Sequence, residues 1–91
     1  MKKKIVVLGS SGSIGKNTVK VLSQLSDRFE VVGLAVKESV ETLAEQSMLL
    51  GCRDLVVENE SALAKLRTLV PADRRCNCGV QALIDLLYDR K

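Results

Sequence analysis

Residues 9–15 of the chain read GSSGSIG, and this stretch decides the fold more than any other. Its glycines have the spacing G-x-x-G-x-x-G. The apolar run from Lys4 to Leu8 precedes it, and a segment of helical periodicity follows it. A glycine-rich turn between a buried strand and a helix is the context in which such a pattern binds the pyrophosphate of a dinucleotide. A glycine turn that serves packing alone is the alternative.

Each glycine of this loop has a predicted physical task. Gly9 lets the chain turn sharply away from the strand, and Gly12 lets the backbone approach a pyrophosphate. Gly15 allows the helix and the strand to pack closely. The helix then presents free N–H groups and the positive end of its dipole to the phosphates, and Ser11 and Ser13 add hydroxyl donors.

A nucleotide-hydrolase P-loop is excluded, although Gly15-Lys16 suggests one. The pattern G-x-x-x-x-G-K-[ST] requires glycine at position 10 and serine or threonine at position 17. The chain has Ser10 and Asn17 at these positions.

Strand-like apolar runs alternate with helical segments along the whole chain. Ser39 and Asn59 are predicted to be the N-caps of two helices. Gly51 follows the predicted end of the first of these helices, and Pro71 follows the end of the second. The alternation predicts an α/β fold, a Rossmann-type parallel sheet with helices on both faces. We expect it to be incomplete, the first half of a doubly wound domain. The predicted strands are residues 4–8, 29–36, 54–57 and 75–78. The predicted apolar helix stripes are Ile14, Thr18, Val21, Leu22 and Leu25; Val40, Leu43, Ala44 and Met48; Leu63, Leu66 and Val70; and Val80, Leu83, Ile84 and Leu87.

Composition limits the classes of partner. The chain has 91 residues, a net charge of +3 and two aromatic residues, Phe29 and Tyr88. Nucleic-acid binders usually combine a basic patch with stacking rings, so we expect no nucleic-acid partner. Lys2 to Lys4 are interpreted as the solvated start of a strand. No segment has the length of a signal peptide's apolar region or of a membrane span, so no membrane association is expected.

The cysteines do not indicate a zinc site. Cys52, Cys76 and Cys78 are odd in number, and the chain has no histidine, whereas structural zinc needs four ligands. They are predicted to be buried or half-buried reduced thiols. This favours a cytoplasmic protein.

Beyond the loop, four further segments are informative: NTVKVL at 17–22, DRFEVVGLA at 27–35, VETLAEQ at 40–46 and GVQAL at 79–83. Together with GSSGSIG, the chain resembles the opening of the 1-deoxy-D-xylulose 5-phosphate reductoisomerase family. The resemblance implies an NADP-dependent oxidoreductase and isomerase of the non-mevalonate pathway of isoprenoid biosynthesis. That family converts 1-deoxy-D-xylulose 5-phosphate to 2-C-methyl-D-erythritol 4-phosphate with NADPH and a divalent metal, Mg or Mn.

The resemblance also implies cofactor-binding residues. One set matches the family's cofactor loop, and the other matches the segment that surrounds the adenosine ribose and its 2′-phosphate. In the second set the family has a glycine, then often a basic or small residue, then asparagine. Here a lysine can still pair with the 2′-phosphate, whereas the following acid is more typical of NAD binding. The two sets are Ser11, Gly12, Ser13 and Ile14, and Lys37, Glu38 and Ser39.

The family is several times longer than this chain. We therefore expect residues 1–91 to be a truncated N-terminal dinucleotide-binding domain, without the catalytic and C-terminal domains. No catalytic or metal-binding residue is assigned, and Asp85 and Asp89 are interpreted as a solvated acidic face. Reduction needs a substrate held against the nicotinamide, and the metal needs convergent carboxylates. The chain alone is therefore expected to bind cofactor without catalysis.

Two other functions are open. One is a stand-alone nucleotide-binding or sensing module, and the other is the cofactor domain of another NAD(P)-dependent reductase. A reading frame that continues past Lys91 favours the reductoisomerase, and a natural stop codon favours the module. Without the other half of the doubly wound sheet, Ile5 to Leu8 would form an exposed apolar edge. We expect a homodimer or other self-association through this edge.

Overall fold

The computed structural model describes residues 2–88, in which strands and helices alternate as predicted. Every predicted strand is present, and each boundary agrees to within about one residue. The observed elements are β1 (Lys3–Leu8), α1 (Ser13–Gln24), β2 (Phe29–Ala35), α2 (Val40–Leu50), β3 (Asp54–Val57), α3 (Glu60–Leu69), β4 (Arg75–Cys78) and α4 (Gly79–Tyr88).

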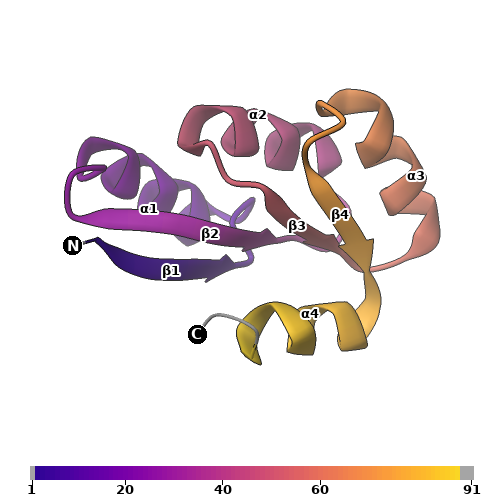
Figure 1. The fold of residues 1–91 in the computed structure, drawn as a ribbon. Helices are drawn as coiled ribbons and strands as arrows, with labels where there is room; N and C mark the ends of the chain where they lie inside the picture. Colours follow the sequence, from indigo (N-terminus) through magenta and orange to yellow (C-terminus); the bar gives the residue numbers. More distant parts are fainter. Residues whose placement is uncertain (1, 89–91) are drawn as a thin grey trace.

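The strands form one parallel sheet in the order β1-β2-β3-β4. Right-handed crossovers that progress in one direction across a sheet place their helices on the same face. Figure 1 shows α1, α2 and α3 together on one face and α4 on the other. The predicted fold class, a Rossmann-type parallel sheet with helices on both faces, is confirmed.

Two cores of different size hold these layers together. The main core lies between the sheet and α1 to α3, where Leu34, Leu43, Leu55 and Leu66 are fully buried. The smaller core lies under α4, whose Leu86 packs against Ala35 and Val56. α4 approaches β2 closely, because a Cβ on Gly33 would lie 2.6 Å from Leu86 Cδ1.

The predicted helix ends are correct, with one difference in detail. Asn59 caps α3, since its side chain accepts a hydrogen bond from the Ala62 N–H at 2.9 Å. Gly51 follows α2, and Val70, the residue before Pro71, is extended. Ser39 is at the N-cap position of α2, but its hydroxyl makes no capping hydrogen bond.

The predicted apolar stripes lie largely on the buried faces of α2 and α3, where Val40, Leu43 and Leu66 are buried, but not on those of α1 and α4. In α1 the buried residues are Gly15, Val19 and Leu22, whereas Ile14 is 83% exposed. Met48 of α2 is likewise exposed. In α1 and α4 apolar residues lie around more than one face, so periodicity alone did not show which face of these two helices meets the sheet.

β1 is an edge strand within the described residues, bonded to β2 on one side. Its apolar half is only partly covered, because Val7 is buried whereas Leu8 is 53% exposed. The predicted unpaired edge is therefore present, but of Ile5 to Leu8 only Leu8 is exposed, because Ile5 and Val6 are half-buried.

Candidate dinucleotide-binding site

The glycine loop is held against the carboxyl end of β2. The N–H groups of Gly9 and Ser10 both donate to the Ala35 carbonyl oxygen, at 2.8 and 3.3 Å. Gly9 has φ +68°, a left-handed conformation that residues with a side chain rarely adopt. The Gly12 N–H then donates to the Gly9 carbonyl at 3.2 Å. The chain thus turns sharply off β1, as predicted.

Gly15 is where α1 meets the loop. A Cβ at this position would lie 2.1 Å from the Gly9 carbonyl oxygen and 2.7 Å from Ser10 Cα. Both atoms belong to the backbone, so no side-chain rotation can relieve the contact. The close packing predicted for Gly15 is therefore a property of the structure.

Gly12 differs from the other two glycines. Its φ of −71° and ψ of 169° are open to any residue. A Cβ there would lie 3.6 Å from the Gly9 carbonyl oxygen, an ordinary van der Waals contact. Gly12 is also exposed. Nothing in the packing of residues 2–88 demands a glycine at this position, which leaves open space in front of the loop.

The N-terminus of α1 is suited to an anion. Gly12 is its N-cap and supplies no side-chain hydrogen bond, and the first turn contains no acidic residue. By contrast, Asn59 caps α3, whose first turn contains Glu60. The first N–H groups of a helix have no partner within it, and the helix dipole adds positive potential there. α1 therefore offers N–H donors to phosphate oxygens.

A groove of about 290 Å³ lies beside this loop, at the carboxyl ends of β1, β2 and β3. Parallel α/β sheets bind ligands at this end. Its walls are largely apolar, and Lys37 and Glu58 are its charged residues. These two residues follow β2 and β3, and the Glu58 N–H donates to the Lys37 carbonyl at 3.1 Å. The lining residues are Leu8, Gly9, Ala35, Val36, Lys37, Val56, Val57, Glu58, Gly79, Val80 and Leu83.

The structure brings only some of the predicted cofactor residues to this groove. Lys37 lines it, whereas Glu38 lines a separate hollow beside Asn59 and Lys65. Glu38 and Ser39 are both exposed. In the loop, Ser11 is half-buried, and Gly12, Ser13 and Ile14 are exposed around the start of α1. The binding roles of these seven residues stay predictions.

Two residues of this region were missed from the sequence. Glu58 directly follows β3 and lines the groove. Its signal was available, because residues that follow neighbouring parallel strands meet at one edge of the sheet. Gln46, on α2, donates through Nε2 to the Ser10 carbonyl oxygen at 2.8 Å. No local pattern indicates this contact, which joins residues 36 positions apart.

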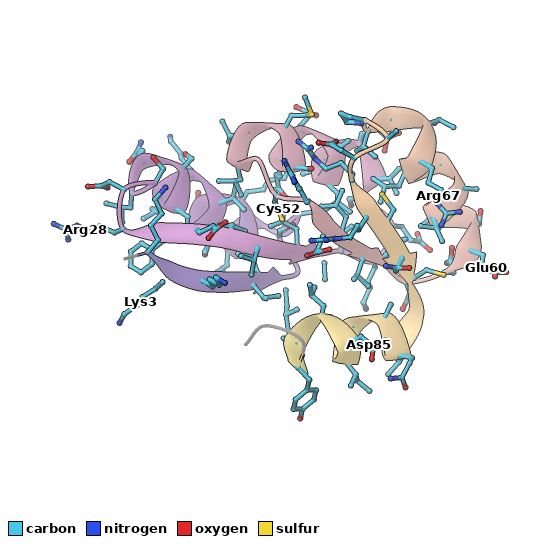
Figure 2. All side chains as sticks on the ribbon, in the orientation of Figure 1. Lys3, Arg28, Cys52, Glu60, Arg67 and Asp85 are labelled. Carbon is cyan, nitrogen blue, oxygen red and sulfur yellow. The ribbon has the colours of Figure 1, made fainter. Side chains whose placement is uncertain are left out.

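The cysteines and the acidic residues of the last helix were also considered as candidate functional groups. Cys52 and Cys76 are buried and Cys78 is half-buried, all as reduced thiols, and Figure 2 shows Cys52 between the sheet and α2. Burial raises the pKa of the Cys76 thiol, which favours the unreactive protonated form. Asp85 is exposed and accepts a hydrogen bond from Gln81 Nε2, and Asp89 lies outside the described residues.

Within residues 2–88, no three histidine, cysteine or acidic side chains are grouped so that they could hold a metal ion. None of the helices described there has the length and apolar character needed to cross a membrane.

Figure 2 shows Lys3 and Arg28 at one end of the sheet and Arg67 on α3 at the other.

Comparison with known proteins decides the family. The family model of 1-deoxy-D-xylulose 5-phosphate reductoisomerase matches residues 5–91. The chain belongs to the 1-deoxy-D-xylulose 5-phosphate reductoisomerase family. It is 45% identical over 67 residues to the reductoisomerase of Halothermothrix orenii, a match that covers 74% of this chain and 17% of that relative.

Solved reductoisomerases have the same fold. The structure is similar to that of the Zymomonas mobilis reductoisomerase in complex with NADPH, with a TM-score of 0.88 and 24% identity. The match covers 94% of this chain and 23% of that one. A second solved reductoisomerase, in complex with NADPH, fosmidomycin and magnesium, matches with a TM-score of 0.84 and 22% identity, over 97% of this chain and 22% of its own. The chain thus spans about a fifth of these reductoisomerases and matches their N-terminal, Rossmann-like part.

Proposed function

We propose that this chain is the cofactor-binding portion of a reductoisomerase and binds NADPH at the glycine loop. The pyrophosphate lies at the N-terminus of α1, and the adenosine end extends along the groove toward Lys37. The single observation that carries this proposal is the space in front of Gly12, where the chain's own packing leaves room for a Cβ. That space adjoins the N–H groups at the start of α1, which have no side-chain cap, and the first turn of α1 contains no acidic residue.

The complete enzyme, by this proposal, rearranges and reduces 1-deoxy-D-xylulose 5-phosphate to 2-C-methyl-D-erythritol 4-phosphate. NADPH supplies the hydride, and the residues present here bind and orient it. A divalent metal, Mg or Mn, belongs to the complete enzyme. The described residues do not fit it, because they contain no cluster of metal ligands. This chain alone is therefore proposed to be inactive, and its reduced cysteines agree with a cytoplasmic location.

Calorimetric titration of the 91-residue chain with NADPH, and separately with NADH, tests the proposal. We expect saturable binding of both, with NADPH preferred. The affinity is expected to be weak, because such a cofactor also contacts the other half of a doubly wound sheet. Absence of heat with either dinucleotide would contradict cofactor binding by this chain.

Lys37 is predicted to provide the preference for NADPH. Lys37 lines the groove, where its ammonium group can pair with the 2′-phosphate. In Lys37→Met we expect the affinity for NADPH to fall by about fivefold to tenfold, since an exposed charge pair with phosphate contributes roughly 1 kcal/mol. Binding of NADH is expected to stay unchanged.

The matched control is Glu38→Gln, which removes the neighbouring charge. If Glu38 only faces solvent, this variant raises the affinity for NADPH slightly, because it removes a negative charge that repels the phosphates of the cofactor. A loss of NADH binding in Glu38→Gln, together with a preference of the unsubstituted chain for NADH, would make Glu38 a ribose-binding acid. The proposed role of Lys37 would then be wrong.

We also propose that the chain self-associates through β1. The support is its unpaired edge within residues 2–88 and the exposure of Leu8, which is 53% exposed. Light scattering at increasing protein concentration is expected to show a dimer or a larger species. A constant monomer mass up to high concentration would contradict the proposal.

A further inference from the structure

We infer that Gln46 is a positioning residue for the dinucleotide loop, which it holds from the neighbouring helix α2. The inference rests on the proposed function. Gln46 Nε2 donates to the Ser10 carbonyl oxygen at 2.8 Å, and the bond is buried. Because Ser10 contributes a carbonyl oxygen, the Gln46 side chain must supply its amide NH₂ to make this bond.

Gln46 is unusual for its place on the helix. Three of the other four buried residues, Val40, Leu43 and Ala44, are apolar, and the fourth, Ser47, has hydrogen-bond partners for its hydroxyl. Gln46 is 7% exposed, and its Oε1 is buried without a hydrogen-bond partner among the described residues. An apolar side chain would fill this position without the penalty of that unpaired oxygen. The amide therefore contributes something that packing does not require, and its one bond is to the loop.

Ser10 is the residue through which the loop is fixed. It is fully buried, its N–H donates to the Ala35 carbonyl at 3.3 Å, and its Cα borders Gly15. Its own hydroxyl is buried without a partner in the described part of the chain, so it does not hold its carbonyl group in place. Gly12, Ser13 and Ile14 of the loop are exposed. Gln46 thus controls the last buried point before the segment that faces the cofactor.

The position of α2 extends this role. The helix begins at Val40, directly after Lys37 to Ser39, and Gln46 lies less than two turns further on. One rigid helix therefore links the loop proposed for the pyrophosphate to the segment proposed for the ribose 2′-phosphate. The Gln46 bond adds to the Gly9 and Ser10 bonds with Ala35 in fixing the distance between these two parts of the site.

The test compares Gln46→Met with Ser47→Ala. Methionine has a similar length and no donor, so it removes the bond to Ser10 and keeps the packing. Ser47 is the matched control, because it is adjacent, fully buried and hydrogen-bonded. Its Oγ donates to the Cys52 carbonyl and accepts from Arg74 Nε, at the end of α2 that is remote from the loop. Gln46→Leu replaces Gln46→Met if the methionine variant melts below the assay temperature.

Two readouts separate this inference from the proposed function. The first is hydrogen exchange of the Ser10 and Gly12 amides without any ligand. We expect it to be about fivefold to tenfold faster in Gln46→Met, the effect of losing one hydrogen bond on local opening, and unchanged in Ser47→Ala. The second is the NADPH dissociation constant, which we expect to rise by a similar factor in Gln46→Met alone.

Equal exchange of these two amides in both variants would overturn the inference. So would faster exchange without a change in NADPH affinity, because the loop position would then not govern binding. If the unsubstituted chain binds no NADPH, the proposed function fails for this chain. The exchange measurement still decides, on its own, whether Gln46 holds the loop.

Discussion

Replacing Gly15 by alanine is expected to lower the free energy of unfolding by about 3 kcal/mol, a large part of the stability of a domain of this size. The added methyl carbon would lie 2.1 Å from the Gly9 carbonyl oxygen and 2.8 Å from the Ser10 carbonyl carbon. These backbone atoms cannot move independently, since the Gly9 and Ser10 N–H groups are bonded to Ala35. Relief requires α1 to shift away from the sheet, which exposes Val19 and Leu22.

Urea unfolding followed by circular dichroism measures this effect, and Gly12→Ala is its matched control. The substitution is the same and lies three residues earlier, where a methyl group meets only the Gly9 oxygen, at 3.6 Å. Its expected cost is below about 1 kcal/mol, the difference between glycine and alanine at an N-cap. Equal unfolding midpoints for the two variants would show that α1 does not pack against the loop as closely as described.

The order of elements was predictable because its signals are local. Asn59 was predicted to cap a helix from its residue type and position, and its side chain does accept the Ala62 N–H. The second strand was predicted from its run of apolar and β-branched residues and begins at Phe29 in the structure. Signals of this kind depend on residues only a few positions apart.

The rotation of the helices about their axes was predicted correctly only for α2 and α3, and even the stripe predicted for α2 contains an error. The stripe in α2 was expected to include Met48, which is 57% exposed, whereas the polar Gln46 and Ser47 are buried. Ser47 is stabilised there by bonds to Cys52 and Arg74. Its partner Arg74 lies 27 positions away. Hydrophobic periodicity carries no information about such long-range hydrogen bonds, so it selects the apolar residues and not always the buried face.

In the candidate site, too, the residues placed by local sequence were predictable, and those placed by long-range contacts were not. The three glycines of residues 9–15 could be assigned tasks from sequence, because a strand, a turn and a helix follow one another there. The structure supports the tasks of Gly9 and Gly15 directly. Glu58 joins the groove only through the pairing of β3 with β2, and Gln46 reaches the loop only through the packing of α2.

Replacing Gly12 by aspartate is expected to act in opposite directions on stability and on binding. The N-cap conformation of Gly12 is one that aspartate adopts readily, and α1 has no side-chain cap. The new carboxylate would accept the N–H of Ile14 or Gly15 and complement the helix dipole. We expect the free energy of unfolding to rise by about 0.5 kcal/mol. The same N–H groups are those proposed for the pyrophosphate.

The loss of NADPH affinity is expected to be roughly a hundredfold or more, because the carboxylate occupies these donors and places a negative charge within a few ångströms of the phosphates. Gly12→Asn separates the two causes, since asparagine caps equally well without the charge. Its affinity should fall between those of the unsubstituted chain and Gly12→Asp in a calorimetric titration. Unchanged NADPH binding by Gly12→Asp would mean that the pyrophosphate does not lie at the N-terminus of α1. A site that gains stability from the substitution that abolishes binding would show that Gly12 is there for the ligand and not for the fold.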